Sequence, residues 1–143
     1  MIIGLCSDHA GFQLKEHIKA VLDKKDIAYH DFGTHSADSC DYPDYAHPLA
    51  VAVEEGKMRM GIACCGSGNG INIVLNKHRG IRSALCWTEE VASLARQHND
   101  ANVLALPARF ISEAQAECII NTFLSSSFEG GRHQKRIDKI PMS

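Results

Sequence analysis

The chain has 143 residues, 45% of them hydrophobic and 22% charged, which fits one folded domain and excludes an intrinsically disordered segment. Its formal net charge of -2 argues against a nucleic-acid partner, which would favour a basic surface. No apolar run reaches the roughly 18 residues that a membrane helix needs, and the N-terminus lacks the features of a signal peptide. We therefore expect a single domain over residues 1–143 that binds neither nucleic acid nor membrane.

Apolar runs alternate with helical patterns along the chain. Leu14, Ile18 and Leu22 recur at a spacing that places them on one face of a helix. Thr88 and Ser112 have the character of N-caps that open two later helices. The expected order is a strand at 2–6, a helix near 14–22, a strand at 28–33, a helix at 43–56, a strand at 60–65, a short helix ending near 76, a strand at 81–86, a helix at 88–98, a strand at 102–106, a helix at 112–124 and a short helix within 129–140.

This alternation predicts an α/β fold. The strands are nearly continuous apolar runs, as expected when helices cover both faces of a sheet, so we expect one parallel sheet sandwiched by helices. Ligands of such folds bind beyond the carboxyl ends of the strands. Polar residues that follow expected strands, such as Asp8, Cys65 and Arg109, are therefore the first candidates for a site.

The segment CCGSGNG at residues 64–70 follows the third expected strand. Redox pairs and zinc motifs need cysteines spaced as C-x2-C, and adjacent strand residues point to opposite faces. The spacing of a P-loop or of a dinucleotide fingerprint is also absent. One remaining interpretation is an anion-binding turn at a helix N-terminus with the Cys65 thiol beside it. The other is a tight turn with two buried thiols, and the loop alone does not decide between them.

Other polar residues also have a functional and a structural interpretation. Asp8 and His9 either contact a ligand, or cap a helix and face solvent. Tyr42 either donates a hydrogen bond in a cleft or packs against its neighbours. His98 would be electrostatically favourable at a helix C-terminus in any case, yet its proton chemistry near neutral pH suits a general acid or base.

Basic residues gather near the end of the chain. Arg132 and Arg136 are four residues apart and therefore share one face of the terminal helix. They form either a solvated basic tail or a phosphate clamp that reaches a neighbouring subunit. Arg109, which follows the last expected strand, could join such a clamp.

The six cysteines indicate reduced thiols and a cytoplasmic location. Three of them, Cys6, Cys65 and Cys86, end apolar runs that have the character of buried strands. Disulfide frameworks belong mainly to small secreted domains, which this chain does not resemble. We therefore expect free thiols at Cys6, Cys40, Cys64, Cys65, Cys86 and Cys118.

Six segments, spread in order over nearly the whole chain, are together similar to one family. They resemble the type B ribose-5-phosphate isomerases, which belong to a larger sugar-phosphate isomerase group with the galactose-6-phosphate isomerase subunits. The segments are SDHAGFQLK (7–15), DYPDYA (41–46), CGSGNGI (65–71), NK-H-RGIR (76–82), RQHNDANVLAL (96–106) and EGGRHQKR (129–136).

The resemblance implies a three-layer Rossmann-like sandwich with a five-stranded parallel sheet and a short C-terminal helix, working as a homodimer or a dimer of dimers. It implies interconversion of D-ribose 5-phosphate and D-ribulose 5-phosphate through an enediolate, in the non-oxidative pentose phosphate pathway, without a metal or other cofactor. The alternatives are isomerisation of a six-carbon sugar phosphate, such as allose 6-phosphate or galactose 6-phosphate, and a non-catalytic sugar-phosphate-binding module.

The resemblance also implies roles for individual positions. Cys65 would be the base that moves a proton between C2 and C1, Ser67 would assist it, and His98 would open the furanose ring. The loop backbone would hold the enediolate oxygen. The residues implied in substrate binding are Asp8, His9, Tyr42, Gly66, Ser67, Gly68, Asn69, Gly70 and Asn99, and those implied in phosphate binding are Arg109, Arg132 and Arg136.

Overall fold

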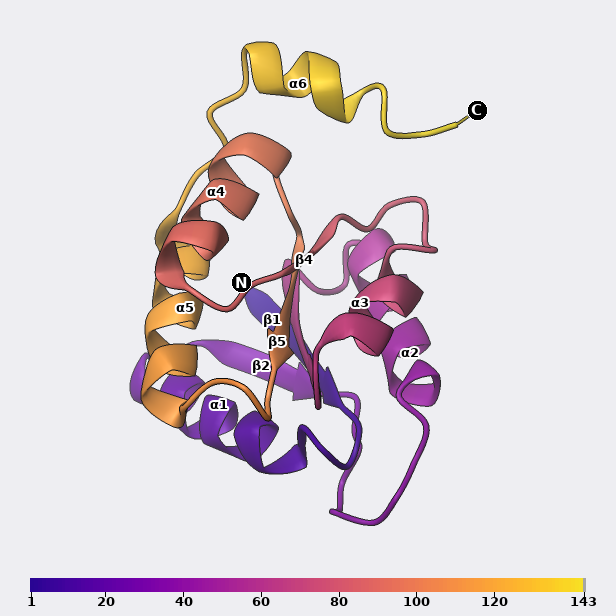
Figure 1. Cartoon of the computed structure of the whole chain (residues 1–143), viewed down its shortest axis with the longest axis vertical. Helices are drawn as coiled ribbons and strands as arrows, with labels where there is room; N and C mark the ends of the chain where they lie inside the picture. Colours follow the sequence, from indigo (N-terminus) through magenta and orange to yellow (C-terminus); the bar gives the residue numbers. More distant parts are fainter. Residues whose placement is uncertain (143) are drawn as a thin grey trace.

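The computed structural model describes residues 1–142, which form a parallel sheet with helices on both faces, as predicted (Figure 1). The elements are β1 (Ile2–Ser7), α1 (Phe12–Lys24), β2 (Ala28–Asp31), α2 (Pro43–Glu54), β3 (Met60–Cys65), α3 (Asn69–Leu75), β4 (Ser83–Leu85), α4 (Glu89–Asn99), β5 (Val103–Pro107), α5 (Glu113–Ser125) and α6 (Arg132–Ile137). The five strands lie in the order β2-β1-β3-β5-β4, and all the pairings are parallel.

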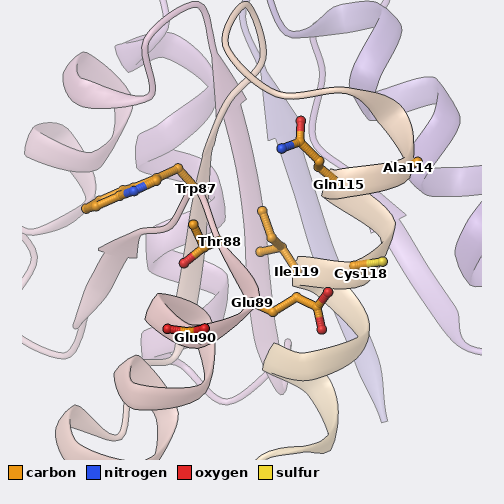
Figure 2. Close-up of a pocket in the computed structure, with 8 residues that line it drawn as sticks. All are labelled: Trp87, Thr88, Glu89, Glu90, Ala114, Gln115, Cys118 and Ile119. Atoms are coloured by element: carbon orange, nitrogen blue, oxygen red, sulfur yellow. The ribbon is translucent and has the colours of Figure 1, made fainter.

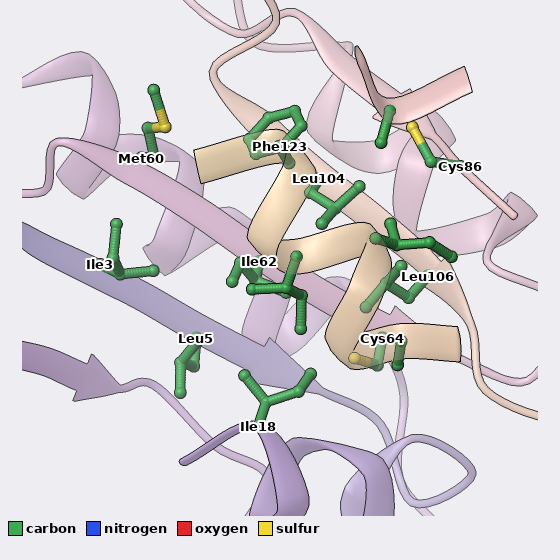
Figure 3. Close-up of a cluster of buried hydrophobic side chains, with 14 of the residues drawn as sticks. Ile3, Leu5, Ile18, Met60, Ile62, Cys64, Cys86, Leu104, Leu106 and Phe123 are labelled. Atoms are coloured by element: carbon green, nitrogen blue, oxygen red, sulfur yellow. The ribbon is translucent and has the colours of Figure 1, made fainter. Parts of the chain in front are cut away.

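Two hydrophobic cores fill the spaces on either side of the sheet. One core joins the sheet to α1, α4 and α5, and Phe123, Leu104 and Ile62 lie within it (Figure 3). The other joins the sheet to α2 and α3. Because side chains alternate along a strand, β3 contributes Cys64 to the first core and Cys65 to the second. The two adjacent cysteines therefore lie on opposite faces of the sheet, as predicted.

Local hydrogen bonds explain where the helices begin. The Val91 N–H donates to Thr88 Oγ1 over 3.2 Å, which confirms the predicted cap of α4. Ser112 and Gln115 exchange side-chain and backbone hydrogen bonds in a capping box at the start of α5, as predicted. Such caps satisfy the N–H groups that a first helical turn leaves without helical partners.

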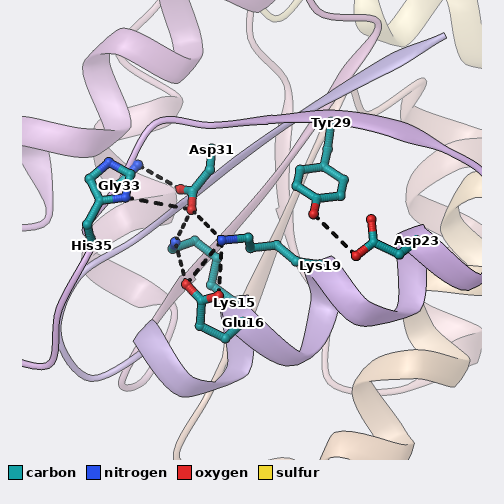
Figure 4. Close-up of polar contacts among 8 residues, drawn as sticks. All are labelled: Lys15, Glu16, Lys19, Asp23, Tyr29, Asp31, Gly33 and His35. Carbon is teal, nitrogen blue, oxygen red and sulfur yellow. Dashed lines mark hydrogen bonds and ion pairs between the residues drawn. The ribbon is translucent and has the colours of Figure 1, made fainter.

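A buried ion pair ties α1 to the carboxyl end of β2 (Figure 4). The Lys15 ammonium is 1% exposed and lies 2.6 Å from Asp31 Oδ2, while the Gly33 N–H donates to Asp31 Oδ1 over 2.8 Å. Burial alone would raise the pKa of Asp31, but the hydrogen bonds from Lys15 and Gly33 outweigh it and hold this pKa below its ordinary value. The Gly33 carbonyl accepts from the Ser7 N–H over 2.8 Å, so the pair fixes the segment that leads into the loop after β1.

The loops after the strands and helix α6 lie at opposite ends of the molecule (Figure 1). The loops that follow the strands lie at one end, near the start of α1, whereas α6 lies at the other end, beyond the last turn of α4 (Figure 1). Within residues 1–142, none of the helices combines the length and the apolar character that crossing a bilayer requires.

Candidate active site

A cavity of about 500 Å³ opens at the carboxyl edge of the sheet. Its lining comes from the loops after β1, β3 and β5 and from the start of α2, because parallel strands deliver their ends to one edge. Eight of the predicted site residues meet there. The lining residues are Asp8, His9, Ala10, Tyr42, Cys65, Gly66, Ser67, Gly70, Arg109 and Phe110.

Cys65 is the last residue of β3 and lies at this cavity with 4% of its surface exposed. Its carbonyl accepts from the Ala108 N–H over 2.9 Å, which holds the end of β3 against the loop after β5. Cys64 is fully buried on the other face, where burial, and then the neighbouring Cys65 thiol, raises the pKa of Cys64 well above its ordinary value. Of these two thiols, only Cys65 can take part in chemistry at the cavity.

The glycine loop turns sharply from β3 into α3. Gly68 has a φ of 78° and precedes the first residue of α3, a left-handed conformation that favours glycine. A Cβ atom at Gly68 would meet the Leu85 side chain, and one at Gly70 would overlap the ring of Tyr42. Ser67 Oγ accepts from the Asn69 N–H over 3.2 Å, inside the same loop. The absence of side chains at Gly68 and Gly70 therefore lets Leu85 and Tyr42 pack directly against the loop backbone.

Asp8 and His9 line the same cavity from the loop after β1. Asp8 Oδ1 accepts from the Gly11 N–H over 3.1 Å, so this carboxylate holds the turn into α1 while it faces the cavity. His9 Nδ1 accepts from the Cys40 N–H over 3.2 Å. Because a neutral imidazole carries one proton, this contact places the proton of His9 on Nε2 and makes that nitrogen a hydrogen-bond donor.

Arg109 supplies positive charge to the cavity. The backbone N–H of Arg109 donates to the Gly66 carbonyl over 3.0 Å, and a Cβ atom at Gly66 would lie 3.1 Å from Arg109 Nη1. The guanidinium therefore lies directly over the glycine loop, as expected for a group that binds an anion there. Phe110, which sequence reasoning missed, lies beside it and is 74% exposed. Its position just after a strand end was the signal that could have identified it.

Four predicted site residues lie far from this cavity. His98 and Asn99 end α4, which leads back to the amino end of β5, and Arg132 and Arg136 belong to α6 (Figure 1). We call these four residues the distal group. The five-residue strand β5 spans about 17 Å, so roughly the height of the sheet separates the distal group from Cys65.

A second hollow, of about 550 Å³, lies between the start of α4 and α5 (Figure 2). The charged residues in its lining are the carboxylates Glu89 and Glu90, which would repel an anion. Trp87 projects from the loop after β4 at its rim. Although it is slightly larger, this hollow lacks the thiol and the guanidinium of the first cavity, so it is not the candidate site for an anionic substrate.

A parallel sheet covered on both faces, with a thiol, a carboxylate, an imidazole and a guanidinium at its carboxyl edge, defines an α/β enzyme. The family model described as Ribose/Galactose Isomerase matches residues 3–140. The chain therefore belongs to the Ribose/Galactose Isomerase family, which confirms the resemblance drawn from the sequence motifs.

Curated and solved relatives agree with this family. Ribose-5-phosphate isomerase B of Escherichia coli is 44% identical over 133 residues, which cover 93% of this chain and 89% of that protein. The ribose 5-phosphate isomerase structure from Thermotoga maritima has 48% identity and a TM-score of 0.96, covering 97% of this chain and 96% of its own. A Mycoplasma genitalium ribose-5-phosphate isomerase B structure with bound ribulose-5-phosphate has 42% identity and a TM-score of 0.93, covering 97% and 93%.

Proposed function

We propose that this enzyme interconverts D-ribose 5-phosphate and D-ribulose 5-phosphate. The observation that carries the proposal is the Cys65 thiol at a cavity whose rim carries the Arg109 guanidinium, a base and an anion binder at one site. The names of the relatives support it, as does the Mycoplasma genitalium structure with bound ribulose-5-phosphate. We also propose that the chain acts as one domain in the cytoplasm, within the non-oxidative pentose phosphate pathway.

In the proposed mechanism Cys65 moves a proton between two neighbouring carbon atoms. Its thiolate takes the proton from C2 of the open-chain aldose and returns it to C1, while the proton of the C2 hydroxyl passes to the oxygen on C1, so that an enediolate forms between the two carbon-proton transfers. The backbone of the loop from Gly66 to Gly70 lies next to the thiol and holds the negative oxygen, a type of contact worth roughly 3–4 kcal/mol per donor. The Ser67 hydroxyl assists the base, and Asp8, His9 and Tyr42 position the sugar hydroxyls.

We further propose that two copies of the chain share each site. The distal group lies at the wrong end of the sheet to reach the cavity of its own chain. A symmetric dimer can place the distal group of one copy over the cavity of the other, and does so twice because a twofold axis relates the copies. His98 then opens the sugar ring, Asn99 binds the sugar, and Arg132 and Arg136 grip the phosphate with Arg109. Two such dimers can pair further into a tetramer.

The phosphate grip predicts a change in KM. Arg132→Ala and Arg136→Ala should each raise KM for ribose 5-phosphate about 10- to 100-fold, because each removes a hydrogen bond to a charged group. Steady-state kinetics with the purified variants would measure the effect. Lys135→Ala is the matched control, since Lys135 is exposed on the same helix between the two arginines and should leave KM unchanged. If KM is unchanged in both arginine variants, the arginines of α6 do not bind the phosphate and form only a solvated basic surface.

The substrate is tested by one comparison of three sugars. A coupled assay should give the highest kcat/KM with ribose 5-phosphate, above allose 6-phosphate and galactose 6-phosphate. A preference for either six-carbon sugar would replace the proposed substrate while keeping the chemistry. Binding of the sugar phosphates without turnover of any of them would instead indicate a binding module.

A further inference from the structure

Two histidines and a glutamate meet at the end of the molecule that carries α6. His98 lies in the last turn of α4, His133 lies in α6, and Glu129 lies in the loop between α5 and α6. The ligand atoms of the three side chains all lie within 4.8 Å of one another. The sequence gives no metal motif here, since His98 is separated from the other two residues by all of β5 and α5.

His133 has a nitrogen atom that the fold leaves without a partner. The residue is 4% exposed, and its Nε2 atom is buried without a hydrogen-bond partner among residues 1–142. The Glu129 carboxylate lies 3.4 Å from this nitrogen, within ion-pair distance but outside hydrogen-bond alignment. Burial, together with the nearby His98 and Arg132, lowers the pKa of His133. The Nε2 atom of His133 is thus a buried polar atom that a ligand from outside the fold can partner.

Backbone contacts hold the three side chains together. The Glu129 N–H donates to the Gln97 carbonyl over 3.0 Å and thereby fastens the loop to the last turn of α4. The rings of His98 and His133 stack with centroids 4.1 Å apart and planes 12° from parallel. The cluster is thus a product of the way α6 packs on α4.

We propose that His98, Glu129 and His133 form a binding site for a divalent transition-metal ion, Zn²⁺ being the best match. Two imidazoles and one carboxylate are a ligand set that zinc accepts, with a fourth position left for water or another oxygen ligand. Imidazole nitrogen disfavours Mg²⁺ and Ca²⁺, which prefer all-oxygen sites. Zinc bonds of about 2.0–2.2 Å require the three atoms to close up by roughly an ångström, and at least one of the two imidazoles must turn out of the stack so that both lone pairs point at the ion.

The bound ion would act as an inhibitor of the enzyme. The ion takes up the lone pair of His98, and the proposed function assigns the opening of the sugar ring to His98. The inhibition therefore rests on the proposed function. Coordination involves no oxidation and no covalent change in the sugar, and removal of the metal by a chelator reverses it. The Glu129 carboxylate offsets one of the two charges of the ion.

Calorimetric titration of the metal-free full-length protein with ZnCl2 tests the site without any measurement of activity. We expect one Zn²⁺ per chain, with His133→Phe and Glu129→Gln each weakening binding at least about tenfold. His133→Phe keeps an aromatic ring to stack on His98 but has no nitrogen, and its melting curve should match that of the wild type. Co²⁺ bound in place of zinc should show an absorption spectrum without thiolate charge-transfer bands.

Two control variants separate this site from other zinc ligands. His47→Phe changes another close histidine pair, in which His47 Nδ1 lies 2.7 Å from His78 Nε2, and should keep the wild-type affinity. Cys118→Ser removes an exposed thiol and should also keep it. Equal zinc affinity in the wild type, His133→Phe and Glu129→Gln, loss of binding in Cys118→Ser, or dissociation constants above about 1 mM would overturn the proposal.

Inhibition by zinc is tested by a separate measurement of enzyme activity. Zn²⁺ should inhibit isomerisation by the wild type, and His133→Phe should need at least about tenfold more zinc for the same fractional loss of its own activity. Equal sensitivity of the two proteins would reject inhibition through this site. If zinc binds as described but no sugar phosphate is isomerised, the proposed function fails and the metal site stands.

Discussion

Replacing Cys65 by alanine should lower kcat for ribose 5-phosphate about 100- to 10,000-fold, the usual contribution of a general base. The variant removes the thiol at the floor of the cavity and leaves Asp8, Arg109 and the loop backbone in place. Binding of the sugar phosphate should therefore persist while proton transfer fails. Steady-state kinetics, with ligand binding measured by calorimetry, would separate these two effects.

The chain offers a matched control one residue away. Cys64→Ala removes a thiol from the opposite face of the same strand, where it contributes only to the core. This variant should lose about 1 kcal/mol of stability and keep a kcat close to that of the wild type. A Cys65→Ala enzyme as fast as its parent would mean that another group is the base.

Mixing two inactive variants should restore activity if the site is shared between copies. Cys65→Ala lacks the base and His98→Ala lacks the ring opener, so each homodimer has two incomplete sites. In a mixed dimer, one site receives Cys65 from one copy and His98 from the other, while the second site lacks both. Random pairing makes half of the dimers mixed with one complete site each, so roughly a quarter of the wild-type activity should return.

The experiment requires the two variants to be unfolded and refolded together in equal amounts and assayed without separating the dimers. If mixed dimers are instead purified through two different tags, they should show roughly half of the wild-type activity. A second pair serves as the control, since Cys65 and Asp8 line the cavity of the same copy. Cys65→Ala mixed with Asp8→Ala should therefore recover nothing. Failure of the first pair to recover, or equal recovery by both pairs, would reject the shared site.

The strands and helices could be predicted because their signals are local. The apolar run at 60–65 became β3 with the same limits, since all six residues are buried. The strand expected at 81–86 is shorter, because side-chain amides take over its first backbone groups. The Arg82 N–H donates to Asn102 Oδ1 over 2.9 Å, and the Ser83 N–H donates to Asn76 Oδ1 over 2.8 Å. The strand order, which depends on packing between distant segments, did not follow from these local patterns.

The residues of the candidate site also form two groups, those that local sequence patterns predict and those that only packing between distant segments places. The residues at the cavity could be anticipated, because any polar residue that follows a parallel strand reaches the same edge of the sheet. The position of the distal group could not, since periodicity places Arg132 and Arg136 on one helix face without saying where that helix packs. Glu129 was not anticipated either, although it lies four residues before His133; its backbone contact with Gln97 and its ion pair with His133 bring it to this cluster.

Because the distal group lies far from the cavity, the proposed activity also depends on the concentration of the chain. A folded copy on its own holds Cys65 and the glycine loop at one end and His98 at the other, with the sheet between them. If the site is shared as proposed, a complete site exists only while a second copy is bound, and we expect the number of working sites to follow the association equilibrium of the chain. On this proposal, newly made protein is inactive until enough of the chain has accumulated for two copies to associate.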